Sequence, residues 1–250
     1  MNGNVYGVHR QEGGPIVATP PLREPLTQQR VVERAIEIAD SDGLDAVSMR
    51  ALGDALGVVP MALYKHVANK DQLLDLMVDV IVLEMRLEHP SSAAWKPAAR
   101  ERLLYARTAM ENHPWAWRAI ETREAPSPVA LDHIEAMIAT LRSGGLSPRL
   151  VHHVMHTLGS RLWGFAQEVF ASAPPPTDPA QLEAAMAFMA QRWPHVLEVA
   201  AASSHDPNTV VGGGCDDAAE FAFAIDVILD GAEALHHAPS REWALPDSNR

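Results

Sequence analysis

This chain of 250 residues has little of what secreted and membrane proteins require. It holds one cysteine, Cys215, so no disulfide can form within the chain, which is typical of a reducing compartment. No apolar run reaches the roughly 20 residues that cross a bilayer, and no basic segment followed by an apolar one opens the chain. We therefore predict a cytoplasmic protein with no membrane partner.

Recurrent catalytic motifs are missing as well. The run Gly212-Gly213-Gly214 follows no predicted strand, so it does not fit a phosphate-binding loop, and there is no nucleophile elbow. His152 and His156 stand four residues apart, a spacing that zinc can use, but neither an HExxH pattern nor a cysteine cluster supplies further ligands. We predict no metal, no cofactor and no enzymatic activity. The alternative is a metal-dependent enzyme that uses His152, His153 and His156.

Strand-like alternation is absent too, whereas apolar residues recur at helical spacing between proline and glycine breaks. A hydrophobic share of 47% is enough for a sizeable core. We therefore predict an all-α protein with four parts. These are a flexible N-terminal extension at 1–25, a three-helix helix-turn-helix domain at 26–72, a larger α-helical ligand-binding and dimerisation domain at 73–240, and a tail at 241–250.

The net charge of −12 argues at first against a nucleic-acid partner. Its distribution weakens that argument, because residues 1–70 hold seven basic and eight acidic residues, so most of the negative charge lies further along. A nearly neutral domain binds DNA when its few cations lie together. Arg10 and Arg23 of the extension are placed to reach a minor groove, or the extension is a tail without a role.

The segment from Thr27 to Leu74 has the layout of a helix-turn-helix. Thr27 caps a first helix with an apolar face at Val31, Ala35 and Ile38, and Asp42-Gly43 ends it. Ser48 caps a second helix, and Gly57 permits the sharp turn that follows. This order of helix, short helix, turn and short helix is typical of DNA-binding domains.

The third short helix carries side chains that a plain core would not use. Leu63 and Val67 are spaced to face inward, which turns the rest of the segment outward. Exposed apolar groups at its start suit contact with thymine methyls, and the polar groups after them can donate to phosphates. The alternative is a small helical subdomain with no DNA partner. The predicted DNA-binding residues are Thr27, Ser48, Arg50, Val59, Pro60, Met61, Ala62, Tyr64, Lys65, His66 and Lys70.

These residues resemble the DNA-binding domain of the TetR family of bacterial repressors. The matching signature runs through Gly43-Leu44, Val47 to Arg50, Leu52 to Val58, Leu63 to Val67, Asn69-Lys70 and Leu73-Leu74. The resemblance implies an all-helical homodimer whose larger domain binds a ligand and which then leaves DNA. It also implies that Ser48 and Arg50 lie near DNA. Pro60 to Ala62 and Lys65 then face bases, and Tyr64, His66 and Lys70 face the backbone. Few direct hydrogen bonds to bases follow, so DNA shape is expected to contribute to specificity.

Two later helices are too apolar for a solvated surface, namely 151–170 and 221–235. Their length suits pairing with a second copy in a four-helix interface, and the segment 221–231 resembles the last helix of the tetracycline-repressor-like branch of that family. The alternative is that both are internal helices of a monomer. The predicted dimer residues are Val154, Leu158, Leu162, Phe221, Ile225, Ile228 and Leu229.

A ligand cavity is also predicted in the larger domain. The run His113-Pro114-Trp115-Ala116-Trp117 stands where this branch of the family commonly lines its cavity, and Met and Trp side chains adapt to flat apolar ligands. Ordinary core packing is the alternative for each residue. The predicted lining is Met110, His113, Trp117, Met137, Leu141, His156 and Trp163.

The whole pattern predicts a ligand-responsive transcriptional repressor. Its expected partners are a palindromic double-stranded DNA operator, a small hydrophobic or aromatic effector and a second copy of the chain. A DNA-binding regulator or activator without a ligand is the alternative.

Overall fold

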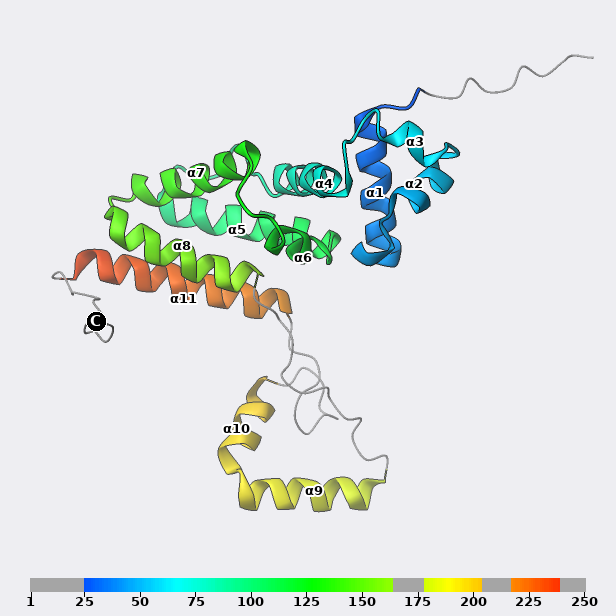
Figure 1. Ribbon diagram of the computed structural model, residues 1–250. Helices are drawn as coiled ribbons and strands as arrows, with labels where there is room; N and C mark the ends of the chain where they lie inside the picture. The colour runs from blue at the N-terminus through cyan, green and yellow to red at the C-terminus, as the bar shows by residue number, and fades with distance from the viewer. Residues whose placement is uncertain (1–24, 164–177, 204–216, 239–250) are drawn as a thin grey trace, which may run out of the picture.

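The computed structural model describes residues 25–163, 178–203 and 217–238, and these ranges contain helices and no strand (Figure 1). The predicted all-α fold is confirmed there. The helices are α1 (Gln28–Asp42), α2 (Met49–Leu56), α3 (Pro60–Leu63), α4 (Lys70–Glu84), α5 (Trp95–Asn112), α6 (Ala116–Glu121), α7 (Pro128–Ser143), α8 (Pro148–Trp163), α9 (Pro179–Arg192), α10 (Pro194–Ser203) and α11 (Asp217–His237).

Local side chains set where the first helices begin and end. The Thr27 hydroxyl accepts a hydrogen bond from the Arg30 amide at 3.2 Å, and the Ser48 hydroxyl accepts one from the Ala51 amide at 3.1 Å. Both predicted caps are therefore confirmed. Gly43 and Gly57 follow α1 and α2 with φ of +86° and +68°, a region that costs glycine little and other residues more.

The first apolar core joins α1–α4 to the corner between α5 and α6. Val31 of α1, Leu52 of α2 and Leu63 at the end of α3 are fully buried in it. Met77 and Ile81 of α4 belong to the same cluster, as do Trp115 and Ala116 from the corner. The helix α4 thus packs on the DNA-binding helices and on the larger domain at once.

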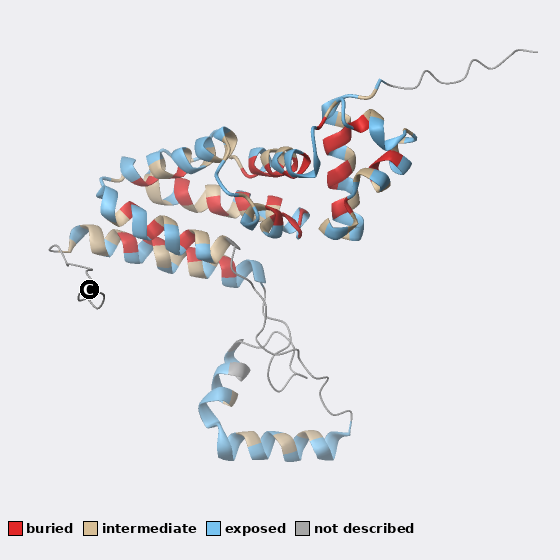
Figure 2. Ribbon diagram, in the orientation of Figure 1, coloured by how far each residue is buried: buried red, intermediate tan, exposed pale blue. Residues whose placement is uncertain are grey.

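The second core lies between α5, α7, α8 and α11 (Figure 2). Leu103 of α5 and Leu141 of α7 are buried in it together with Leu158 of α8 and Ile225 of α11. The helices α8 and α11 lie side by side along much of their length in Figure 1 and share the closest packing in the larger domain. None of the described helices is long and apolar enough to cross a membrane.

The pair α9–α10 stands apart from both cores in Figure 1, and its described side chains are exposed or only half-buried in Figure 2. The helix α9 is capped by Asp178 and Trp193, and α10 follows directly from Pro194. Of the longer predicted helix 151–170, the described part ends at Trp163. All but the last residue of the predicted N-terminal extension at 1–25, and the whole of the predicted tail at 241–250, lie outside the described residues.

Candidate DNA interface and effector cavity

A close backbone approach sets the angle between α2 and α3. The Val58 amide donates to the Gly53 carbonyl at 2.9 Å. A Cβ placed on Gly53 would lie 2.8 Å from the Val58 carbonyl oxygen and 3.4 Å from the Pro60 ring. Only glycine fits at this position without moving the turn. The sequence interpretation missed Gly53, because a single glycine inside a helical pattern has no spacing that marks it.

The start of α3 presents apolar side chains to solvent. Val59 is 69% exposed and Met61 is 73% exposed, while Leu63 and Val67 are buried as predicted. The turn after α3, which contains His66 and Val67, is held against α1 because the Gln28 side chain donates to the His66 carbonyl at 2.9 Å. An exposed apolar tip on a well-packed helix suits a partner surface that carries methyl groups, such as the thymine edge of a major groove.

Three cations belong to the same part of the chain, one on α2, one directly after α3 and one at the start of α4. Arg50, Lys65 and Lys70 are exposed, and none of them forms an ion pair with another described residue. Tyr64 is also exposed, at the end of α3, and the predicted contacts Thr27 and Ser48 lie exposed at the starts of α1 and α2. Cations without ion pairs and exposed hydroxyls in the same helices as an apolar tip suit contact with phosphates on either side of a groove.

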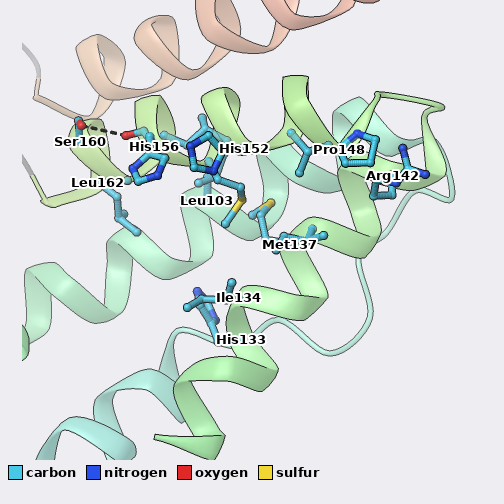
Figure 3. Close-up of a pocket in the computed structure, with 15 residues that line it drawn as sticks. Leu103, His133, Ile134, Met137, Arg142, Pro148, His152, His156, Ser160 and Leu162 are labelled. Carbon is cyan, nitrogen blue, oxygen red and sulfur yellow. Dashed lines mark hydrogen bonds between the residues drawn. The ribbon is translucent and has the colours of Figure 1, made fainter. Parts of the chain in front are cut away.

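A cavity of about 760 Å³ opens between α7 and α8 (Figure 3). Its walls are mainly apolar, with Ile134 and Met137 of α7 facing Met155 of α8 and Leu103 of α5 behind them. A few polar groups interrupt this lining. They are His133, Arg142, His152, His156 and Ser160. The rings of His152 and His156 meet edge to face with centroids 4.5 Å apart.

A second cavity of about 530 Å³ lies between α4, α6 and α7. Val78, Val82 and Met85 from the α4 side form its apolar wall. His133 and Ile134 line both cavities, so these two side chains form a shared wall between them. Burial lowers the pKa of His133, and the charges of Arg102 and Arg86 lower it further, so this ring is neutral at neutral pH.

The predicted lining residues divide between cavity and core. Met137 and His156 line the first cavity. Leu141 instead is fully buried in the second core and Met110 packs against the first, so neither lines the cavities described here. Trp117 is half-buried and also lies away from them, and the side chain of Trp163 falls outside the described residues. Helical spacing predicted that these residues lie on apolar helix faces, but spacing alone does not show which of those faces borders a cavity.

His113 is not among the residues that line the two cavities. It is 9% exposed and its ring is held between two carboxylates. Nδ1 lies 2.8 Å from Asp40 of α1 and Nε2 lies 2.9 Å from Glu84 of α4, while the Trp115 indole donates to the same Asp40 oxygen at 2.6 Å. Burial lowers the pKa of His113, but the hydrogen bonds and charges of the two carboxylates outweigh it, so the pKa is raised overall.

Most of the predicted dimer residues are already covered within one chain. Val154, Leu158, Phe221, Ile225 and Leu229 are buried where α8 meets α11, and Leu162 and Ile228 are half-buried there. The large apolar residues that α11 exposes are Phe223 and Val227 instead. Both faces of α11 carry apolar residues, so periodicity alone did not show which face is buried by other helices of the same chain.

The three histidines of α8 that suggested a metal site do not gather carboxylates or thiols. Within the described ranges there is no group of three or more His, Cys, Asp or Glu side chains that could hold a metal ion. His152 and His156 border the first cavity instead, and His153 borders a separate groove against α11.

Two family sequence models match the chain. Residues 31–77 match the model described as bacterial regulatory proteins of the tetR family, and residues 90–236 match the tetracyclin repressor-like C-terminal domain. The chain belongs to the TetR family. The resemblance seen in the helix-turn-helix signature is thereby confirmed, and the second TetR match covers more than half of the chain, including every residue that lines the first cavity.

TetR-family relatives with curated descriptions match about half of this chain. An HTH-type transcriptional regulator of Saccharopolyspora erythraea is 37% identical over 127 residues, which cover 51% of this chain and 52% of the relative. The HTH-type transcriptional repressor DrrR1 of Streptomyces coeruleorubidus is 38% identical over 147 residues, which cover 54% and 52%. The chain spans about half the length of these curated relatives.

Solved structures of the TetR family match more of the chain. The Streptomyces coelicolor TetR family protein ActR in complex with actinorhodin is 28% identical, with a TM-score of 0.65 over 85% of this chain and 98% of ActR. ActR in complex with (S)-DNPA is 27% identical, with a TM-score of 0.62 over 85% of this chain and 100% of ActR. Both contain a small molecule bound to a fold similar to this one.

Proposed function

We propose that this TetR-family chain is a cytoplasmic transcriptional repressor that leaves its DNA operator when a small hydrophobic or aromatic effector binds. The observation that carries this proposal is the continuity between two sites. A helix-turn-helix with an exposed apolar tip and unpaired cations packs on α4, and α4 also forms one wall of the second cavity. The second cavity is separated from the first by His133 and Ile134 of α7, which line both. A movement of α4 on ligand binding would therefore shift the DNA-binding helices that pack on it.

The DNA contact rests on α3 and the residues around it. Val59, Pro60 and Met61 reach the base edges in the major groove, where they recognise thymine methyls. Arg50, Lys65 and Lys70 bind phosphates together with Tyr64 and His66. For Lys65 this differs from the contact to a base that the family resemblance implies. With few hydrogen bonds to bases, the affinity depends strongly on salt and the specificity depends partly on DNA shape.

The effector site is the first cavity. Its volume of about 760 Å³ lies within the usual range of small-molecule pockets, and its largely apolar lining with a few polar groups suits a flat or aromatic molecule. The ActR complexes support a small-molecule ligand, because actinorhodin and (S)-DNPA are the small molecules named in them. They are the first compounds to test on this chain.

The repressor acts as a dimer that places two DNA-binding helices on successive major grooves, about 34 Å apart. The exposed side of α11 and the adjacent side of α8 form the interface. Phe223 is 67% exposed and Val227 is 53% exposed there, beside a groove lined by Leu150, Thr157 and Ile228. Two such pairs of helices build a four-helix interface around a two-fold axis.

The test starts with a selection of operators. Full-length protein is incubated with a pool of randomised duplexes, the bound sequences are recovered, and their dissociation constants are measured for the wild-type protein and Lys65→Ala. The matched control is Arg192→Ala on the exposed surface of α9. We expect a palindromic sequence whose binding weakens in Lys65→Ala but not in Arg192→Ala. Recovery of no preferred sequence would refute the repressor assignment.

The effector half of the proposal is tested on the same duplex. Candidate aromatic compounds are added at saturating concentration, and binding to the protein is measured separately by calorimetry. Because the two equilibria are linked, a compound that binds the cavity must weaken DNA binding by the factor by which DNA weakens its own binding. A compound that occupies the cavity and leaves operator affinity unchanged would contradict effector control.

A further inference from the structure

One buried polar contact connects the DNA-binding helices to the larger domain. His113 lies directly after α5, Asp40 lies near the end of α1, and Glu84 is the last residue of α4, so the imidazole joins three helices at their ends. Trp115 holds Asp40 in place from the α6 side. Arg123, after α6, also joins the larger domain to the start of α4, where it pairs with Asp75 at 2.7 Å. The ion pair between Arg118 and Asp45 is 3.7 Å long and highly exposed. Exposed pairs of that length contribute little.

The arrangement of hydrogen bonds requires a particular protonation state. An imidazole donates from both nitrogens only when it is protonated, because the neutral ring has one N–H and one acceptor. Both His113 nitrogens face carboxylate oxygens, which only accept. Loss of the proton therefore leaves a ring lone pair pointing at one carboxylate and breaks one side of the bridge.

The groups that face His113 favour the charged ring. Asp40 on α1 and Glu84 on α4 are the charged groups that contact it, and the uncharged Trp115 indole faces it edge-on from the α6 side. Burial opposes the charge but does not outweigh the carboxylates, so the pKa of His113 lies above its ordinary value of 6.5. The bridge is thus complete at acidic pH and is lost as the pH rises through that raised pKa.

We propose that His113 is a positioning residue whose protonated ring fixes the DNA-binding helices against the larger domain in the arrangement that binds DNA. This inference rests on the repressor function proposed above. The bridge lies close to the cavities, because Val82 and Met85 next to Glu84 line the second cavity, and α5 carries Leu103 into the first. Any shift of α4 against α5 separates Glu84 from His113.

The first experiment is a pH profile of operator affinity at constant ionic strength, from about pH 5.5 to about pH 8.5, the range in which histidine titrates. The duplex is the one obtained by selection. Four full-length proteins are compared, namely wild type, His113→Gln, Asp40→Asn and the control His195→Gln, whose ring is exposed on α10. Asp40→Asn removes one side of the bridge and keeps the imidazole, in case His113→Gln does not fold.

We expect wild type and His195→Gln to lose at least about five-fold in affinity as the pH rises, which is the lower end of ordinary coupling between sites. His113→Gln and Asp40→Asn should bind weakly at low pH and show a smaller pH dependence. His66, in the predicted DNA-binding segment, is the same in all four proteins, so the difference between profiles isolates His113. Profiles that stay parallel in folded variants would overturn the proposal.

The second experiment needs no DNA and separates this inference from the repressor function. Nitroxide labels on Ala55→Cys of α2 and Ala139→Cys of α7, both exposed, report the distance between the two domains when Cys215→Ser is also present. We expect the distance distribution of wild type to change between the same pH limits, and that of His113→Gln to resemble wild type at high pH throughout. A distance distribution that is unchanged by both pH and the substitution would refute the proposed role of His113, even if DNA binding is normal.

Discussion

The two ends of this molecule use apolar residues in opposite ways. Around α1–α3 they fill a continuous core, and the exposed ones are confined to the tip of α3. In the larger domain, apolar residues of α7 and α8 face an open cavity, and others on α11 face outward. A well-filled core holds one geometry, whereas an incompletely filled one leaves room for a ligand and for movement. The difference suits a DNA-binding end that stays rigid and a larger domain that responds.

The largest expected effect tests the filled end. Leu63→Ala removes a fully buried side chain that connects α3 to the core, and we expect a loss of about 2–5 kcal/mol in the free energy of unfolding. Ile134→Ala at the wall of both cavities should lose less, about 1 kcal/mol, because part of that side chain already faces a void. Chemical denaturation of both variants measures the difference. Equal losses would remove the contrast between the two ends.

The next effect concerns the outward face of α11. Val227→Glu places a charge in the proposed dimer interface, and we expect a loss of about 2 kcal/mol or more in dimer stability with the fold intact. Light scattering after size-exclusion chromatography measures the mass, and circular dichroism monitors the helices. The matched control is Val199→Glu on α10, which is also exposed but lies away from that face. A dimer that survives Val227→Glu would place the interface elsewhere.

A smaller effect is expected where α2 meets α3. Gly53→Ala brings a Cβ within 2.8 Å of the Val58 carbonyl, so the turn must shift, at a cost of about 1–3 kcal/mol typical of overpacking. Operator affinity should fall as well, since the tip of α3 moves with the turn. Asp54→Ala, the next residue and an exposed one, serves as the control. Denaturation and DNA-binding measurements on the same samples show whether stability and affinity change together.

The smallest effect is on a single phosphate contact. Lys65→Ala should cost about 1 kcal/mol of operator affinity and reduce the salt dependence by about one counterion. The loss should be similar for specific and nonspecific duplexes, because a phosphate contact carries no sequence information. Titrations at several salt concentrations give the slope. A loss confined to the specific duplex would make Lys65 a contact to a base.

The sequence predicted the DNA-binding end in more detail than the rest. Caps and turns are local, so Thr27, Ser48 and Gly57 could be placed from their neighbours alone. In the larger domain the sequence predicted the helices, but it did not predict which face of each helix lies against the core, a cavity or a partner chain. Leu141 and Leu158 were expected at a ligand and at a partner chain, and both are buried in the core. Which side of a helix meets a cavity depends on neighbours that are distant in the sequence, and spacing does not record them.

The bridging role of His113 also lay beyond the sequence. Its partners stand 73 and 29 residues away, and each is an ordinary exposed acidic residue by pattern. Family resemblance directed attention to the run His113 to Trp117, but it suggested a ligand contact. In the folded chain the ends of α1 and α4 both contact the His113 ring.

The shared first core has a consequence for modularity. A fragment that stopped at residue 72 would lose Leu73, Met77 and Ile81, which cover the inner faces of α1–α3, and it would lose Trp115 as well. Such a fragment would expose much of its interior to water, so the DNA-binding helices are not a portable unit that can be grafted onto another protein at that boundary. Any chimera has to carry α4 and the corner at Trp115 with them, and the same continuity predicts that both ends unfold in one cooperative transition.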